Sequence, residues 1–428
     1  MAFSTYADTL NYLYAQLPMF TRVGATAYKA DLSNTLALCE ALNHPEHAFK
    51  SVHIGGTNGK GSSSHMLAAI LQTAGYKTGL YTSPHLRDFR ERIRINGQMM
   101  PEQEVIDFVN THQALFESIK PSFFESTVAM AFDYFAKQKV DLAIIEVGLG
   151  GRLDSTNVIH PLLSLITNIS LDHQDLLGST LGEISTEKAG IIKPHTPIII
   201  GEKQTETAAI FTQKAVEKEA KLVFAQTCWK VHQIESAAYL TVQAESKNSS
   251  LELILDLTGT YQLKNLPGVL SAVDELRSQG FKITEEHVKT ALKQVTSLTG
   301  LQGRWQTLKH TPLVICDTGH NEDGVREVLK NISLTPHQNL HLVWGMVKDK
   351  DSAKILSLLP KTAHYYFCQP NIPRGKDAGE LAQEAQTFGL KGETHASVAE
   401  AYQQALSHAK PNDLVFVGGS TFVVAEVI

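Results

Sequence analysis

The sequence predicts an α/β protein with two domains: an N-terminal domain with a mainly parallel sheet and a phosphate-binding P-loop, and a smaller, Rossmann-like C-terminal α/β domain. Short apolar, β-branched runs alternate with helical patterns along most of the chain, which is typical of parallel strands buried on both faces. The 428 residues exceed what one hydrophobic core usually holds, about 250–300 residues. A glycine-rich stretch follows the first predicted strand and opens a helix.

The composition indicates an ordinary soluble protein, with 43% hydrophobic and 19% charged residues. A net charge of −6 argues against nucleic acid as a partner, since nucleic-acid-binding domains carry a basic face. The four cysteines show no zinc-site or disulfide spacing, so we expect buried free thiols. The N-terminus lacks the pattern of a signal peptide and no apolar run is long enough to span a bilayer, so we expect a cytoplasmic protein with no membrane partner.

In the first domain, KSVHIGG leads into the helix KGSSSHMLAAILQTAG, which we expect to end at Gly75. RIRINGQMM predicts a β-hairpin, because Asn96-Gly97 is a typical tight-turn pair. After about residue 222, alternating polar stretches predict an antiparallel meander. The further strands that we predict in this domain are KTGLYTS, DLAIIEVG, LLSLITNI and TPIIIG.

A stretch rich in Gly, Ser and Thr, TSLTGLQGRWQTL, predicts a linker near residues 295–303. We therefore divide the chain into domains 1–296 and 297–428. The second domain reads as another series of strands and helices, ending in a short final helix. Its predicted strands are LVICDTG, LHLVWG, AHYYFC and DLVFVG.

The stretch SVHIGGTNGKGSSS departs from the usual P-loop pattern, because Ile54 replaces the first glycine and Gly61 follows Lys60. It still offers glycines that let backbone amides face an anion, and a helix N-terminus that favours negative charge. Lys60 would face the β- and γ-phosphates, and Ser62 and Ser63 are the nearest hydroxyls to approach a magnesium ion. The alternative is a glycine-rich turn without a ligand.

Three other strand ends contain possible ligands. In an open α/β sheet, ligands bind outside the carboxyl ends of the strands, so Ser83, Glu146 and His173 should lie near the phosphate magnesium. Taken singly, each has a plainer explanation: Ser83 as a cap before Pro84, Glu146 as a surface acid, and His173 as a loop histidine. Elsewhere, Lys188 reads as a solvated lysine, Arg304 as a packing arginine, and Asp317, His320 and Asn321 as a strand-end loop.

Together, the motifs resemble those of folylpolyglutamate synthase and dihydrofolate synthase, in the Mur ligase superfamily. HIGGTNGKGSSS, TSPHL, IEVGLGGRLDSTN, ISLDHQDLLG, EKAGIIK and DTGHN occur in that family's order over essentially the whole chain. The resemblance implies a Mur ligase-like fold and ATP-dependent amide formation. ATP would phosphorylate a carboxylate of dihydropteroate or reduced folate, and L-glutamate would displace the phosphate. It also implies Mg²⁺ as a cofactor and carbamylation of Lys188, and we expect a monomer.

Carried over by motif, the resemblance also implies roles for individual residues. The catalytic residues would be Lys60, Lys188 and His320. The ATP-binding residues would be Asn58, Gly59, Lys60, Gly61, Ser62, Asn265 (contacting adenine), Arg304, Asp317 and His320. The metal ligands would be Ser83, Glu146 and His173, and the residues near the pterin would be Phe124, Glu125 and Asp154.

Two local departures from the family pattern occur in the second half. Gly319 and Glu322 flank His320 and Asn321 where the family often has D-x-A-H-N-P, and Tyr261 stands where many members have histidine. One rival interpretation is a Mur ligase for a UDP-linked peptide, disfavoured because only 54 residues precede Gly55. Another is a non-catalytic nucleotide switch. The choice between dihydropteroate, reduced folate or both stays open, and the segment 21–34 shows no motif that decides it.

Overall fold

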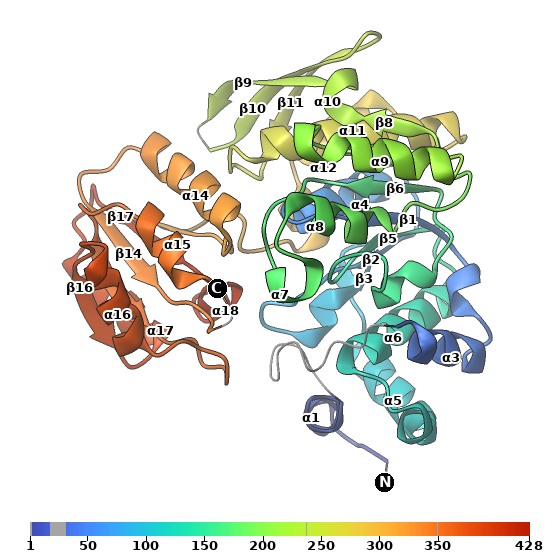
Figure 1. Cartoon of the computed structure of the whole chain (residues 1–428), viewed down its shortest axis with the longest axis horizontal. Helices are drawn as coiled ribbons and strands as arrows, with labels where there is room; N and C mark the ends of the chain where they lie inside the picture. The colour runs from blue at the N-terminus through green and yellow to red at the C-terminus, as the bar shows by residue number, and fades with distance from the viewer. Residues whose placement is uncertain (1, 18–30, 237, 349) are drawn as a thin grey trace. The chain divides into compact units, whose positions relative to one another are not determined.

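The computed structural model describes residues 2–17, 31–236, 238–348 and 350–428. The chain forms two compact units, shown blue to yellow and orange to red in Figure 1. Unit 1 comprises Met1–Asp256 and Gln262–Gly300, and unit 2 comprises Leu257–Tyr261 and Leu301–Ile428. Residues 21–30 of the segment without a motif lie outside the described residues. No helix in the described parts of the chain is both long and apolar enough to cross a membrane.

Unit 1 is built on an eight-stranded sheet. The pairs among β2, β5, β1, β6, β7 and β8 are parallel, and a hairpin adds β3 and β4 antiparallel at one edge. In spatial order the strands are β4 (Gln98–Met99), β3 (Ile93–Ile95), β2 (Thr78–Tyr81), β5 (Leu142–Glu146), β1 (Lys50–Gly55), β6 (Leu163–Ile166), β7 (Ile198–Ile200) and β8 (Leu222–Phe224).

Helices cover both faces of this sheet. The apolar helix α4 (Lys60–Thr73) packs on β1, β2 and β5, with α11 (Gln262–Ser278), α12 (Glu285–Leu292) and α13 (Val295–Thr299) against it. The opposite face of β5 directs Ala143 and Ile145 into a cluster with Phe132 and Phe135 of α6. The remaining α-helices in the described part of unit 1 are α1 (Tyr6–Gln16), α3 (Ser33–Ala41), α5 (Glu102–Ile119), α6 (Phe123–Lys137), α7 (Gln174–Leu177), α8 (Leu181–Ala189), α9 (Thr205–Glu217) and α10 (Ala225–Cys228).

A three-stranded antiparallel sheet follows, β9 (Lys230–Ser236), β10 (Leu240–Glu245) and β11 (Ser250–Leu255). It confirms the predicted meander. The predicted hairpin is also confirmed, with Asn96 and Gly97 at positive φ between β3 and β4. The helix after the phosphate loop, α4, ends as expected just before Gly75, whose φ is +89°.

Unit 2 contains a six-stranded sheet in which all pairs but β12–β13 are parallel. Its strands are, in spatial order, β12 (Gln306–His310), β13 (Leu313–Cys316), β17 (Leu414–Gly418), β14 (Leu340–Trp344), β15 (His364–Cys368) and β16 (Gly392–His395). Its helices are α14 (Glu322–Leu334), α15 (Ser352–Leu358), α16 (Ala378–Thr387), α17 (Val398–His408) and the short final helix α18 (Thr421–Ala425).

Three details differ from the sequence-based expectation. The Gly-, Ser- and Thr-rich stretch is not an open linker throughout, because α13 and β12 occupy both of its ends. One short segment after the meander, Leu257–Tyr261, also belongs to unit 2, and the chain then returns to unit 1 at Gln262. All four cysteines are free, but only Cys39, Cys316 and Cys368 are buried, whereas Cys228 is exposed.

The hairpin turn supplies a test of packing in unit 1. Gly97 has φ +76°, and a Cβ there would lie 1.9 Å from the carbonyl oxygen of Leu298. Gly280 has φ +93° but open space around it. We expect Gly280→Ala to lower the free energy of unfolding by about 1–2 kcal/mol, the cost of the left-handed conformation. Gly97→Ala should cost about 1–3 kcal/mol more. Urea unfolding followed by circular dichroism measures both, and equal losses would contradict the predicted collision.

Candidate active site

The phosphate loop leaves β1 at Gly55 and enters α4 at Lys60. Gly56 and Gly59 have positive φ, +133° and +83°. A Cβ on Gly56 would lie 1.9 Å from Thr167 Oγ1, and one on Gly59 would lie 2.2 Å from Asn265 Oδ1. Both positions therefore require glycine, for backbone conformation and for space. The contact also brings Asn265 of α11 to the loop, although the two are far apart in sequence.

The segment after β6 braces this loop through backbone and side-chain hydrogen bonds. Thr57 N donates to Asn168 O over 2.9 Å, and Asn58 N donates to Asn168 Oδ1 over 2.9 Å. Asn58 Nδ2 donates to Ser170 Oγ over 3.1 Å, and Thr167 Oγ1 donates to Asn58 O over 2.6 Å. Residues 167–170 therefore fix the conformation of the loop. The helix α4 has no side-chain cap, so its first backbone amides point toward the loop.

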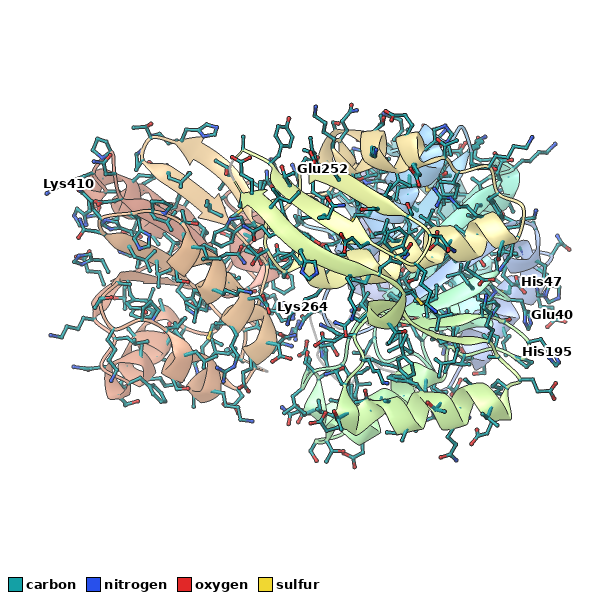
Figure 2. The ribbon with its side chains drawn as sticks, turned by 90° about the horizontal axis from the view of Figure 1, so that it is seen from above. Glu40, His47, His195, Glu252, Lys264 and Lys410 are labelled. Carbon is teal, nitrogen blue, oxygen red and sulfur yellow. The ribbon has the colours of Figure 1, made fainter. Side chains whose placement is uncertain are left out.

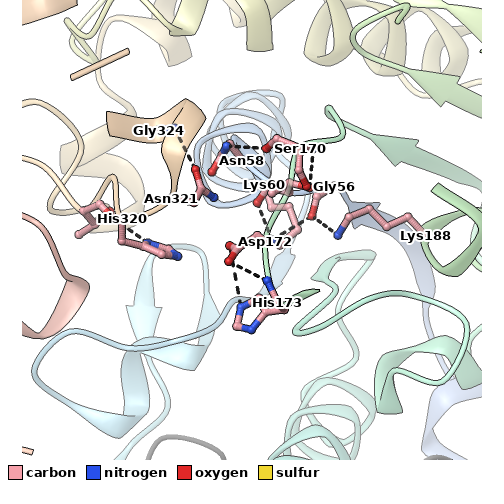
Figure 3. Close-up of polar contacts among 12 residues, drawn as sticks. Gly56, Asn58, Lys60, Ser170, Asp172, His173, Lys188, His320, Asn321 and Gly324 are labelled. Carbon is pink, nitrogen blue, oxygen red and sulfur yellow. Dashed lines mark hydrogen bonds and ion pairs between the residues drawn. The ribbon is translucent and has the colours of Figure 1, made fainter. Parts of the chain in front are cut away.

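Two lysines converge on one carbonyl oxygen of the loop (Figure 3). Lys60 Nζ donates to Gly56 O and Thr57 O, both over 3.1 Å, and Lys188 Nζ donates to Gly56 O over 2.9 Å. Lys188 is only 4% exposed, so the expectation of a solvated lysine is wrong. Burial and then the neighbouring Lys60 lower the pKa of Lys188 to about 7, although Asp172 and Asp154 oppose the shift.

The predicted metal ligands lie at neighbouring strand ends, because β2, β5, β1 and β6 are consecutive in the sheet. Ser83 N donates to Glu146 Oε2 over 3.3 Å, and Glu146 is buried rather than a surface acid. His173, directly before α7, is in the left-handed conformation, and its backbone N donates to Asp172 Oδ1 over 2.9 Å. A hydroxyl, a carboxylate and an imidazole form a donor set suited to Mg²⁺ or Mn²⁺.

Asp172 is a candidate that the sequence analysis missed. It stands directly before His173 in the same strand-end segment, and its carboxylate acts electrostatically on Lys188. Figure 3 shows it beside Lys60 and His173. The sequence pattern could have found it, because Asp172 is an acidic residue after a parallel strand, which is the same pattern that predicted Glu146.

The three residues predicted near the pterin have structural partners. Glu125 closes a capping box at the start of α6, and its carboxylate accepts from Ser122 N and Asn34 Nδ2. Asp154 accepts from Leu149 N over 2.8 Å and from Thr156 N over 3.0 Å, and burial raises its pKa. Phe124 is half-buried, and a Cβ on Gly148 would lie 2.3 Å from its ring. Glu125 and Asp154 therefore shape the surrounding backbone.

In unit 2, Asp317 gathers three segments at the end of β13. Its Oδ2 accepts from Tyr261 OH over 2.6 Å and from Trp305 N over 2.7 Å, and its Oδ1 accepts from Gly319 N over 2.8 Å. Burial raises the pKa of this carboxyl, against the effect of these hydrogen bonds. Tyr261, which replaces the common histidine, thus holds the crossing segment Leu257–Tyr261 onto unit 2.

The remaining predicted residues of unit 2 cluster around the same turn. Arg304 Nη1 donates to Gly303 O over 3.1 Å and also contacts Thr318 Oγ1. His320 Nδ1 lies 3.0 Å from Thr318 O, and Asn321 caps α14 through Gly324 N over 2.9 Å.

Comparisons with known proteins assign the chain to a family. The profile of the Mur ligase middle domain matches residues 54–273, and that of the Mur ligase glutamate ligase domain matches residues 303–421. The chain belongs to the Mur ligase family. This member is an ATP-dependent ligase, since the curated relatives that match it along most of its length are folylpolyglutamate and dihydrofolate synthases.

Among these relatives, the dihydrofolate synthase/folylpolyglutamate synthase of Bacillus subtilis is 30% identical over 99% of both chains. That of Escherichia coli is 33% identical over 88% of this chain and 85% of its own. This ligase spans only 50% of a relative from Haloferax volcanii, a probable bifunctional folylpolyglutamate synthase/dihydropteroate synthase that is 31% identical over 98% of this chain.

Solved structures give the same family. E. coli FolC in complex with DHPP and ADP has a TM-score of 0.86 at 31% identity, covering 99% of this ligase and 97% of that chain. The Yersinia pestis enzyme complexed with AMPPNP and a Mn ion has a TM-score of 0.85 at 30% identity, with the same coverage. The predicted Mur ligase-like fold is confirmed.

The phosphate loop yields a test by nucleotide binding. Gly59→Ala would strain the left-handed backbone by about 1–2 kcal/mol and drive a methyl group toward Asn265. We expect the affinity for ADP, measured by calorimetry, to fall by at least about tenfold. Gly75→Ala is the matched control, because Gly75 follows the other end of α4 with positive φ and open space. A loss of affinity as large in the control would contradict a local effect at the loop.

Proposed function

We propose that the chain catalyses the ATP-dependent addition of L-glutamate to dihydropteroate, to the γ-carboxylate of reduced folates, or to both. The observation that carries the proposal is the convergence of four strand ends in unit 1. The braced phosphate loop, the Ser83–Glu146 contact, His173 and the buried Lys188 all lie at the carboxyl edge of one sheet. A nucleotide switch needs the loop, but it has no need of a buried lysine and carboxylate beside it.

The chemistry follows from the poor reactivity of a carboxylate toward amines. A carboxylate oxygen of the pterin substrate attacks the γ-phosphorus of ATP, ADP leaves, and an acyl phosphate results. The amino nitrogen of glutamate then attacks the acyl carbon, inorganic phosphate leaves, and the nitrogen loses a proton. Lys60 and the first amides of α4 would neutralise the phosphate charge that develops in the first step.

Ser83, Glu146 and His173 would hold the divalent metal, which we propose to be Mg²⁺. Bound there, the ion would screen the phosphate oxygens from the incoming carboxylate. Asn58, Gly59, Gly61, Ser62 and Asn265 would complete the nucleotide contacts in unit 1. Ser62 is tied to α11, since Gln262 Nε2 donates to Ser62 Oγ over 3.2 Å. Within the same helix, Asn265 Nδ2 donates to Gln262 Oε1 over 2.7 Å.

For the second half we propose a glutamate-ligase domain, residues 297–428, after an ATP- and pterin-binding domain, residues 1–296. Arg304, Asp317 and His320 would serve the nucleotide, with His320 taking part in catalysis. Asp317 supports this role indirectly, because its carboxylate fixes the backbone on which Arg304 and His320 stand. Phe124, Glu125 and Asp154 would lie near the pterin, with Phe124 offering an aromatic face. A monomer in the cytoplasm remains our proposal for assembly and localisation.

One assay tests the function and resolves the choice of substrate. Purified protein with ATP and magnesium is given dihydropteroate or tetrahydrofolate, each with and without L-glutamate. We expect glutamate-dependent release of ADP and a product heavier by one glutamyl residue with at least one pterin, measured by mass spectrometry. Glutamate-independent ADP release with no new product would favour a nucleotide switch, and no glutamylated product from either pterin would refute the proposal.

We also propose that Lys188 is carbamylated. Carbamylation joins a neutral amine nitrogen to CO₂ and releases a proton, so it requires an amine that loses its charge near neutral pH. A pKa of about 7 provides such an amine, whereas an ordinary lysine stays protonated near pKa 10.4. The resulting anion would face Lys60, replacing a repulsion between two cations with an attraction.

The modification is testable by carbon-13 NMR with labelled bicarbonate. We expect a carbamate signal that grows as pH rises from 6 to 8, because the neutral fraction of Lys188 increases through its pKa of about 7. Lys188→Arg should abolish the signal. Lys193→Arg is the matched control, since burial and Lys218 lower the pKa of Lys193 to about 8. A signal that disappears with Lys193→Arg instead would place the carbamate on Lys193 and contradict the proposal.

A further inference from the structure

A second cluster of metal-ligating side chains lies in the segment 43–47, before the first strand of the large sheet. His44, Glu46 and His47 occupy the turn after α3 and the short helix η2 (Pro45–His47). One ligand atom from each of the three lies within 4.8 Å of the others. Because β1 begins at Lys50 and carries the phosphate loop at its far end, the cluster is at the opposite edge of the sheet from the proposed active site. Figure 2 shows His47 at the periphery of unit 1.

The separations within this cluster match those of metal ligands. Glu46 Oε1 lies 3.0 Å from His44 Nδ1 and 3.6 Å from His47 Nε2. Two ligand atoms that are each about 2.1 Å from a tetrahedral zinc ion are roughly 3.4 Å apart. The observed distances lie on either side of that value, so small side-chain rotations would suffice to bind an ion. The two imidazole rings are nearly parallel, at 18° with centroids 5.5 Å apart.

Glu46 provides independent support for a cation. Its side chain is 3% exposed, whereas those of His44 and His47 are 54% and 56% exposed. Its second oxygen, Oε2, is buried and accepts no hydrogen bond from a nitrogen or oxygen donor among the described residues, although the neighbouring Cys39 thiol is a weak donor to this carboxylate. A buried carboxylate is costly unless it is paired or coordinates a metal. An ion held between the exposed imidazoles and this carboxylate would be reachable from solvent and would neutralise the buried charge.

The chemistry of the neighbours narrows the class of ion. The Cys39 thiol is not among the ligand atoms that lie within 4.8 Å of one another. The donor set is therefore two imidazole nitrogens and one carboxylate oxygen, which suits zinc and related transition metals better than Mg²⁺ or Ca²⁺. A third imidazole is near, since the His160 ring centroid lies 6.2 Å from that of His47.

We propose that His44, Glu46 and His47 form a structural site for a zinc-class transition metal, separate from the catalytic metal. The ion would tie the end of α3 and η2 together directly before β1. It would thus stabilise the entry of the strand that carries the phosphate loop. The alternative is an ion pair of Glu46 with protonated histidines, which needs no metal.

Cobalt serves as the probe, because Co²⁺ in a tetrahedral nitrogen and oxygen environment absorbs visible light. Chelator-treated full-length protein, without nucleotide and with excess Mg²⁺ to saturate the catalytic site, is titrated with Co²⁺ and then with Zn²⁺ as competitor. We expect one equivalent of bound cobalt that zinc displaces. His44→Ala with His47→Ala should weaken binding by more than about tenfold, since even the partners of metal ligands contribute ten- to a hundredfold.

His195→Ala is the matched control, because His195 is also exposed and faces a single glutamate, with His195 Nδ1 3.6 Å from Glu219 Oε2. This variant should bind cobalt like the unaltered chain. Thermal unfolding gives a second readout: zinc should raise the midpoint of the unaltered chain and of His195→Ala, but not of the double variant. Equal cobalt binding in all three proteins, or no stoichiometric binding to the unaltered chain, would overturn the proposal and leave the ion pair.

Discussion

The carbonyl oxygen of Gly56 accepts hydrogen bonds from both Lys60 and Lys188, and much of the site depends on this shared contact. Two ammonium groups on one oxygen repel each other, and the deeply buried one has the lower proton affinity. The contact therefore fixes the position of two side chains that come from different helices. Burial, and then the neighbouring Lys60, lower the pKa of Lys188 to about 7, so that its nitrogen is available for chemistry near neutral pH.

This contact depends on the backbone conformation of the loop. Gly56 and Gly59 pass so close to Thr167 and Asn265 that no side chain fits at either position. Hydrogen bonds from the segment after β6 hold the intervening residues from the outside. The same strand order that brings β6 beside β1 brings β5 and β2 to its other side. One sheet topology thus places the phosphate loop, Glu146, Ser83 and His173 at a common edge.

Unit 2 is organised around a different carboxylate. Asp317 accepts from a tyrosine in the crossing segment, from the backbone before β12 and from its own turn. These partners satisfy both oxygens of a carboxylate that burial would otherwise destabilise. The residue that looks like a ligand in the sequence therefore also acts as the anchor of its unit. Glu125 and Asp154 in unit 1 show the same double character, since their carboxylates accept backbone amides.

The sequence by itself determined the fold class, the family and most of the strands, because period and turn signals such as Asn96-Gly97 act locally. It also indicated the phosphate loop, since glycines between a strand and a helix let backbone amides face an anion. Tertiary structure alone decided that Lys188 is buried, that Asn265 touches Gly59 and that Tyr261 holds Asp317. Each of these contacts joins segments that are far apart in the sequence, and a local sequence pattern does not show which distant segments pack together. The burial that lowers the pKa of Lys188, and thereby its chemistry, exists only once those segments have packed together.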